Sequence, residues 1–265
     1  MIDPRAIVDP SARLGVDVSI GPWTIIGPGV EIGDGTRIAA HVVLKGPTQI
    51  GRNNRIFQFS SVGEDTPAFA YQGEPTTLSI GDDNVIREGV TIHRGTAQHT
   101  GTTVIGNHNL LMAYVHVGHD CVVGDHVVMA NNSSISGHVN LGDWANVGGY
   151  AGVPQFRSIG AYTHIAGMSL VLKDVPAFVT VSGHPAGVVG LNEEGMRRRG
   201  FSVAVVAALR DAYRTVYRRG HTVQEALSLL SDAAAEFAEV KTFVDSISSS
   251  RWGIVRSRGA EGAQV

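Results

Sequence analysis

Residues 114–126, YVHVGHDCVVGDH, bring together groups that could do chemistry. The stretch holds three histidines, an aspartate directly after one of them, and the only cysteine of the chain. Neutral imidazoles and thiolates bind zinc, a thiolate can act as a nucleophile, and a histidine beside a carboxylate can act as a general base. Which of these applies depends on the scaffold that carries the stretch.

That scaffold has a period of six. Aliphatic residues recur at every sixth position, interrupted twice, at Leu14, Ile20, Ile26, Ile32, Ile38, Leu44, Ile50, Ile56, Val62, Ile80, Ile86, Ile92, Ile105, Leu111, Val117, Val123, Met129, Ile135, Leu141, Val147, Val153, Ile159, Ile165 and Val171. A period of six residues matches neither the 3.6 residues per turn of an α-helix nor the two-residue alternation of a β-strand. It suits a short strand followed by a sharp corner. Three hexads then form one coil, and coils stack by strand pairing about 4.8 Å apart. The sequence predicts a mainly β fold, a parallel β-helix of hexapeptide repeats.

The register places the reactive groups at a corner. Val117 and Val123 point inward, and His116, His119 and Asp120 lie around the turn between them, with their polar side chains expected to face outward. The interior is filled by aliphatic residues and cannot hold a substrate. A site on the outside becomes a pocket only where a loop or another subunit covers it, so we expect an oligomer.

Spacing argues against metal and thiol chemistry. In hexapeptide-repeat proteins that resemble carbonic anhydrases, the zinc histidines include a pair five residues apart, whereas His116 and His119 are three apart. Cys121 lies two residues before the inward Val123 and is expected to pack in the core, where a thiolate is disfavoured. General base catalysis remains, with His119 taking a proton and Asp120 fixing its tautomer. A histidine on a solvated surface is the alternative.

Two segments interrupt the hexads, residues 63–79 and 94–104. Insertions in solenoids leave from corners, and long loops on a rigid scaffold commonly carry function. We expect both loops to form part of the wall of the substrate-binding site. The alternative is that they are insertions without a function.

The hexads stop after Pro176, where the pattern becomes helical. Ser202 is suited to cap one helix that Gly220 ends, Thr222 and Glu225 form a capping box for a second, and a third is expected near 239–247. We therefore divide the chain into a β-helix over 1–187, a helical domain over 188–256 and a disordered tail over 257–265.

Composition excludes several classes of protein. The chain has 21 Lys and Arg against 24 Asp and Glu, a formal charge of -3, and lacks a basic stripe with interleaved aromatics, which argues against nucleic acid as a partner. No apolar run approaches the roughly 20 residues of a transmembrane segment. One cysteine excludes an intrachain disulfide framework, so we expect a soluble, cytoplasmic protein.

Four segments carry a resemblance to a known family. NLLMAYVHVGHDCVVGDH, VTIHRGT, SISGHVNLGDWANVGG and EEGMRRRGFS, placed along such a prism, resemble the acyl-carrier-protein-dependent UDP-N-acetylglucosamine O-acyltransferases that begin lipid A biosynthesis. The resemblance extends from Met1 to about Arg256. It implies a left-handed β-helix, a homotrimer with sites between neighbouring prisms, and transfer of a 3-hydroxyacyl chain from acyl carrier protein to the 3-hydroxyl of UDP-N-acetylglucosamine. It implies no metal and no cofactor, the acyl-ACP being a substrate.

The resemblance also implies roles for individual residues. His119 would be the general base, Asp120 would hold it, and the Gly137 N–H would stabilise the oxyanion. Positions that match substrate-binding residues are His93, His116, His138, Gln155, Asn192, Glu194, Arg198 and Arg199, the last four near the nucleotide and its phosphates. Gly167 matches a position that limits acyl-chain length, and Met168 beside it can refill the space. A basic face for the acidic carrier protein comprises Arg197, Arg198, Arg199, Arg210, Arg214, Arg218 and Arg219.

Some positions depart from the family pattern. Ala68 and Ala70 replace an acid and a base that usually touch the nucleotide sugar, Pro154 stands where relatives commonly carry histidine, and His184-Pro185 replaces a turn that contains asparagine. Three alternatives stay open: a paralogue acylating a different nucleotide sugar, a non-catalytic trimeric scaffold, and a coenzyme-A-dependent acetyltransferase.

Overall fold

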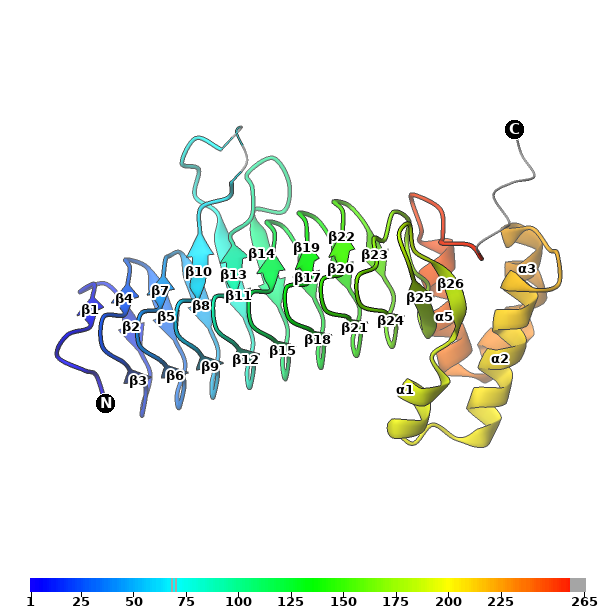
Figure 1. Cartoon of the computed structure of the whole chain (residues 1–265), viewed down its shortest axis with the longest axis horizontal. Helices are drawn as coiled ribbons and strands as arrows, with labels where there is room; N and C mark the ends of the chain where they lie inside the picture. Colours follow the sequence, from blue (N-terminus) through cyan, green and yellow to red (C-terminus); the bar gives the residue numbers. More distant parts are fainter. Residues whose placement is uncertain (68, 70, 258–265) are drawn as a thin grey trace.

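The hexads fold into a three-sided prism of stacked coils (Figure 1). The computed structural model describes residues 1–67, 69 and 71–257. Each coil contributes one strand to each of three sheets, and strands one coil apart are parallel neighbours. Residues 18 apart pair directly, as Val117 with Ile135 and Val123 with Leu141 do. The predicted parallel β-helix is confirmed.

The three sheets are numbered by their first strand. Sheet 1 contains β1 (Ile7–Val8), β4 (Ile25–Ile26), β7 (Val43–Leu44), β10 (Ser61–Glu64), β13 (Thr91–His93), β16 (His116–Val117), β19 (Ser134–Ile135) and β22 (Gly152–Val153). Sheet 2 contains β2 (Arg13–Leu14), β5 (Val30–Ile32), β8 (Thr48–Ile50), β11 (Thr77–Ile80), β14 (Thr102–Ile105), β17 (Val122–Val123), β20 (Asn140–Leu141) and β23 (Ser158–Ile159). Sheet 3 contains β3 (Ser19–Ile20), β6 (Arg37–Ile38), β9 (Arg55–Ile56), β12 (Val85–Ile86), β15 (Leu110–Leu111), β18 (Val128–Met129), β21 (Asn146–Val147), β24 (His164–Ile165), β25 (Val179–Ser182) and β26 (Gly187–Leu191).

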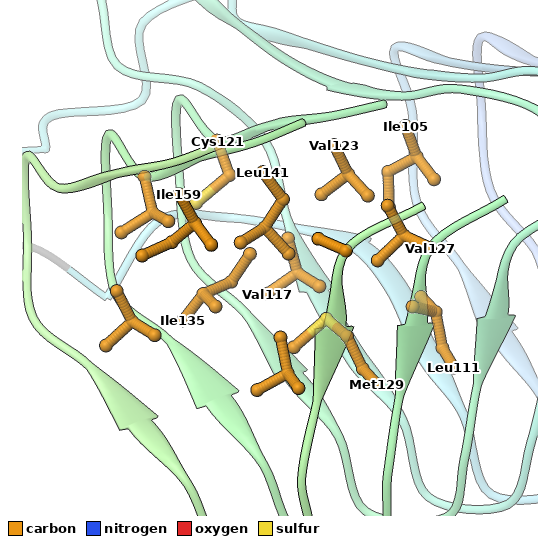
Figure 2. Packing of buried hydrophobic residues seen from close by; sticks show 14 of the residues in the cluster. Ile105, Leu111, Val117, Cys121, Val123, Val127, Met129, Ile135, Leu141 and Ile159 are labelled. Atoms are coloured by element: carbon orange, nitrogen blue, oxygen red, sulfur yellow. The ribbon is translucent and has the colours of Figure 1, made fainter. Parts of the chain in front are cut away.

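An aliphatic column fills the prism (Figure 2). Leu111, Val117 and Ile135 are fully buried, as the six-residue period predicts, while Leu14 in the first coil is only half-buried. Cys121 also lies in this column, and its Sγ donates to the Ser136 carbonyl at 3.1 Å. Burial raises the pKa of its thiol to about 12. Cys121 is therefore a core residue, and the thiolate needed for nucleophilic catalysis is strongly disfavoured.

Corners of the prism require left-handed backbone at non-glycine residues. The loop corner, between sheets 1 and 2, has positive φ at Asp120, His138 and Phe156. The aromatic corner, between sheets 2 and 3, has positive φ at Asp17, Asn53, Asp83, His108, His126, Trp144, Tyr162 and Phe178. The third corner, between sheets 3 and 1, has positive φ at Trp23, His41, Phe59, Tyr114, Asn132, Tyr150 and Met168. Side chains at equivalent positions therefore stack in columns along each corner.

Two loops leave the prism side by side at the loop corner, residues 65–76 after β10 and 94–101 after β13 (Figure 1). Buried Arg94 ties the first loop down. Its Nη1 donates to the carbonyls of Gly63 at 2.6 Å and Gly46 at 3.1 Å, and its Nη2 contacts Asp65. The insertions were predicted over 63–79 and 94–104. Both ends of the first segment and the C-terminal end of the second belong to strands β10, β11 and β14.

Five helices follow the β25–β26 hairpin at the far end of the prism (Figure 1). They are α1 (Glu193–Arg198), α2 (Val203–Tyr217), α3 (Val223–Leu229), α4 (Ser231–Glu236) and α5 (Ala238–Ser248). Ser202 caps α2, and the predicted capping box of Thr222 and Glu225 is formed at α3. The short α1 and α4 were not predicted, and most of the predicted tail lies outside the described residues. Within the described part of the chain, no helix combines the length and apolarity needed to cross a membrane.

Core packing predicts a large cost for a cavity. Replacing the fully buried Ile135 with alanine should lower the free energy of unfolding by about 2–5 kcal/mol, measured by urea denaturation. Val122→Ala is the matched control, because Val122 is exposed on the outer face of sheet 2 and should change stability by roughly 0.5 kcal/mol or less. Equal losses in both variants would contradict a packed column at Ile135.

Candidate active site

The loop corner stacks polar residues from three successive coils. His119, Gly137 and Gln155 follow one another at intervals of 18 residues and form one column along the corner. Asp120 and His138, each the next residue in the chain, belong to the neighbouring column. Because coils lie about 4.8 Å apart, residues distant in sequence become neighbours here. The fold thus gathers the residues predicted to perform catalysis.

His119 and Asp120 form a hydrogen-bonded pair. The distance from His119 Nδ1 to Asp120 Oδ2 is 2.8 Å, and the two side chains are 12% and 0% exposed. As expected, Asp120 projects outward from the prism, and loop 94–101 then covers its carboxylate and buries it. The His119 ring lies outside the aliphatic column and stays partly accessible, as a general base requires.

Loop 94–101 satisfies the buried carboxylate. Thr96 donates to Asp120 through its backbone N–H, at 3.1 and 3.0 Å to the two oxygens, and through its hydroxyl at 2.7 Å, while the Thr100 hydroxyl donates at 2.9 Å. Burial raises the pKa of Asp120, but hydrogen bonds from His119, Thr96 and Thr100 outweigh it and leave the pKa lowered. An ionised Asp120 only accepts, so His119 Nδ1 carries the proton of this hydrogen bond.

His138 forms an aromatic wall beside the pair. Its ring stacks on Phe156 at 4.4 Å and meets His119 edge-on at 4.8 Å, and His99 of the second loop packs against it at 4.1 Å. Burial lowers the pKa of His138 and Asp120 opposes this, with a net lowering. His138 is therefore suited to act as a neutral hydrogen-bonding group at neutral pH.

His93 and His116 line the sheet 1 side of the same corner. Their ring centroids are 5.4 Å apart, His93 Nδ1 donates to the Asp65 carbonyl at 2.7 Å, and His116 Nδ1 contacts the Thr91 hydroxyl at 2.9 Å. Burial, followed by the neighbouring His93 and His119, lowers the pKa of His116. Gln155 is exposed two coils beyond His116.

Gly137 fits against the His119 imidazole. A Cβ at this position would lie 2.5 Å from His119 Nε2, so any side chain would displace the ring. At the aromatic corner, side chains of the following coil accept from equivalent amides, as Asp143 does from Asp125 at 2.9 Å. The Gly137 N–H has no acceptor among the residues the structure describes, and it is available to an oxyanion.

His119, Asp120 and His138 could also hold a metal by proximity, since their ligand atoms lie within 4.8 Å of one another. The Asp120 carboxylate, however, already accepts from Thr96, Thr100 and His119. A cation would replace these hydrogen bonds, so the donor set favours an acid–base pair.

The nucleotide-binding candidates lie in a different place. Asn192, Glu194, Arg198 and Arg199 line a cavity of about 710 Å³ between α1, sheet 3 and the aromatic corner. Asn192 caps α1 by accepting from the Gly195 N–H at 3.0 Å, and its Nδ2 donates to the Tyr162 carbonyl at 2.8 Å. The single chain does not bring this group to His119.

Carboxylates neutralise much of the predicted basic face. Glu194 binds both Arg197 at 2.6 Å and Arg198 at 2.7 Å, and Glu193 binds Arg210 at 2.9 Å. Arg219 likewise pairs with Asp211. The net positive charge offered to an acidic partner is smaller than the arginine count indicates.

The acyl-length candidates occupy the third corner. A Cβ on Gly167 would approach the Gly149 carbonyl at 3.2 Å, and the Met168 side chain is exposed beside it. The departures Ala68 and Ala70 lie outside the described residues.

Sequence reasoning missed several residues of both sites. Phe156 follows His138 by 18 positions, so the coil period could have identified it. Thr96, His99 and Thr100 approach through a loop without periodicity, and no sequence signal placed them. Trp144 in the cavity wall follows the 18-residue period of the aromatic corner.

A prism of stacked hexads with a histidine–carboxylate pair at one corner defines a hexapeptide-repeat transferase. The family model described as bacterial transferase hexapeptide (six repeats) matches residues 11–46 and 102–137. The model described as Udp N-acetylglucosamine O-acyltransferase, domain 2, matches residues 174–255. The chain belongs to the acyl-[acyl-carrier-protein]–UDP-N-acetylglucosamine O-acyltransferase family, which confirms the predicted resemblance.

Relatives match along almost the whole chain. The enzyme of that name from Stutzerimonas stutzeri (strain A1501) is 61% identical over 256 residues, covering 97% of this chain and 99% of the relative. The structure of LpxA from Acinetobacter baumannii has a TM-score of 0.94 at 49% identity, covering 96% of this chain and 99% of that one. The UDP-N-acetylglucosamine O-acyltransferase of Moraxella catarrhalis has a TM-score of 0.95 at 47% identity, with the same coverage.

The contact between Gly137 and His119 predicts a catalytic defect without unfolding. Gly137→Ala should lower kcat by about 100-fold, because the new Cβ displaces the imidazole by an ångström or more. Acyl-transfer rates and thermal unfolding together test this. Gly190→Ala is the control, since a Cβ there has nothing within 4 Å. Unchanged turnover in Gly137→Ala would contradict the proposed position of the base.

Proposed function

We propose that this protein is an O-acyltransferase that moves a 3-hydroxyacyl chain from acyl carrier protein to the 3-hydroxyl of UDP-N-acetylglucosamine, the first step of lipid A biosynthesis. The observation that carries the proposal is the His119–Asp120 pair, 2.8 Å apart, with Nε2 free and an unpaired amide beside it. Relatives of 61% identity that bear this activity in their names support the substrates.

The geometry supports a general-base mechanism. His119 Nε2 takes the proton of the sugar 3-hydroxyl as its oxygen attacks the thioester carbonyl. The Gly137 N–H donates to the resulting oxyanion, and Asp120 stabilises the imidazolium through Nδ1. Collapse of the intermediate breaks the C–S bond, and the leaving thiolate takes the proton from His119. The cycle balances without a metal or cofactor.

Neighbouring side chains orient the acceptor. His116, His138 and Gln155 offer neutral hydrogen-bonding groups around His119, with His93 beside them, because the lowered pKa values of His116 and His138 keep both uncharged at neutral pH. Neutral groups suit an uncharged sugar, whereas charged groups nearby would perturb the proton transfer. These residues therefore bind the sugar, and His119 acts on it.

The active unit we propose is a homotrimer. His119 lies at the loop corner, while Arg198 and Arg199 lie at the cavity beside the aromatic corner, so one nucleotide sugar reaches both only across two chains. The third corner exposes an apolar stripe made of Trp23, Phe59, Tyr114, Tyr150 and Met168. These exposed apolar groups, which alternate with His41, Gly89 and Asn132 along the corner, suit a contact surface. A second copy of the chain is the partner that would complete the site.

Two further assignments follow from the proposal. Acyl carrier protein is the donor partner, and the helices α1 and α2 with their arginines are the surface we assign to it. We place the protein in the cytoplasm, where its single buried thiol needs no oxidising environment.

A specific observation favours one alternative, a paralogue that acylates a different nucleotide sugar. Ala68 and Ala70 remove charged groups from the first loop, which favours a different nucleotide sugar as acceptor. The chemistry at His119 would be the same.

Activity with UDP-N-acetylglucosamine and 3-hydroxyacyl-ACP tests the function. Wild-type protein should form the acylated product by mass spectrometry, and His119→Ala should lose roughly 10²–10⁴-fold in kcat, because the general base is removed. His221→Ala, remote from both sites, should retain full activity. Turnover only with another UDP-sugar would favour the alternative, and full activity of His119→Ala would refute the mechanism.

Mixing two inactive variants tests the shared site. After co-refolding equal amounts of His119→Ala and Arg199→Ala chains, random trimers should recover about a quarter of the wild-type activity, since one site in four pairs an intact base with an intact arginine. When the nucleotide sugar is kept well below the KM of an Arg199→Ala site, each variant refolded alone should stay nearly inactive. Absence of recovery in trimers shown to be mixed would place both residues in the same chain's site.

A further inference from the structure

Arg199 lies on an aromatic shelf in the wall of the nucleotide cavity. Its guanidinium carbon is 4.6 Å from the ring centroid of Trp144 and 5.9 Å from that of Tyr162. Both rings belong to the aromatic corner, one coil apart. A guanidinium over an indole face is held by cation–π attraction and stacking.

The shelf is itself fixed by the coil register. Trp144 stacks on His126 at 4.0 Å with an interplanar angle of 12°, and Tyr162 stacks on Phe178 at 4.9 Å with an angle of 7°. Phe201 meets Tyr162 edge-on at 5.2 Å from the helical side. The rings therefore present a rigid surface, and a cation placed on it loses little further conformational freedom on binding a ligand.

The guanidinium keeps unused donors. Its Nη1 donates to the Gly195 carbonyl at 2.9 Å, whereas its buried Nε has no hydrogen-bond partner in the described chain, and Nη2 contacts no described acceptor. The nearby Glu194 is committed to Arg197 and Arg198. Arg199 is thus a half-buried cation without a carboxylate partner, which is the setting of an anion site.

We propose that Trp144 is a positioning residue, which with Tyr162 holds Arg199 so that its free edge donates to the diphosphate of the nucleotide substrate. Stacking uses the face of the guanidinium and leaves its N–H groups for phosphate oxygens. The identity of the nucleotide sugar rests on the proposed function. The shelf itself requires only a nucleoside diphosphate in this cavity.

Removal of the ring should weaken binding without slowing chemistry. Trp144→Leu should raise the Kd for UDP, measured by calorimetry, and the KM for the nucleotide sugar by roughly 5- to 30-fold, the worth of a partly desolvated cation–π contact. The value of kcat should change less than twofold. Trp144→Phe keeps an aromatic face and should restore most of the affinity, which a merely structural role for the indole would not predict.

A double-mutant cycle isolates the contact. Arg199→Met should weaken UDP binding, and adding Trp144→Leu to it should cause little further loss if the indole acts through the arginine. Additive losses would overturn the proposal, as would an unchanged Kd in Trp144→Leu. Thermal unfolding of each variant identifies any that fails to fold, and Trp144→Phe then carries the test.

Fluorescence gives a direct readout of the shelf. The chain has three tryptophans, so Trp23→Phe with Trp252→Phe leaves Trp144 as the only indole. Titration with UDP should change its emission with the same Kd that calorimetry gives, and Arg199→Met should abolish the change. Binding of UDP without any change in emission would overturn the proposal. Binding that depends on Trp144 without acyl transfer would refute the proposed function alone.

Discussion

Pairing of each strand with the strand one coil further along is the constraint on which the structure depends, at an offset of 18 residues that widens to 30 and 25 where the two loops are inserted. It places Val117 over Ile135 inside the prism, and by the same step it places His119 over Gly137 outside. Aliphatic burial enforces the offset, because a slip of one residue would turn the column toward water. The packing of the aliphatic core therefore sets the position of His119 relative to Gly137.

The inserted loops supply the burial and the hydrogen-bond donors that the repeating coils do not give to Asp120. A carboxylate at a bare corner would be solvated and screened, whereas loop 94–101 removes Asp120 from water and replaces the lost hydration with donors from Thr96 and Thr100. The pair with His119 then operates in a setting where its charge is held in place. Buried Arg94 holds the base of the neighbouring loop through the Gly63 carbonyl and Asp65.

The sequence predicted the parts that repeat. The six-residue period identified the column, the corner and the burial of Cys121, and capping residues identified α2 and α3. It did not predict the cover over Asp120, because Thr96 and His99 reach the corner through an aperiodic loop. The pairing of Glu194 with Arg197 and Arg198 was also missed, since charge counts carry no geometry. Family motifs identified His119 and Arg199 but could not say that they lie at different corners.

That separation has a consequence for the life of a single chain. A single chain holds two separate halves, the His119–Asp120 pair at one corner and the Arg199 shelf beside another. In the homotrimer proposed above, catalytic competence would arise when the chains associate and would follow subunit concentration by mass action. The proposed acyl transfer would therefore fall on dilution by more than the fall in chain concentration.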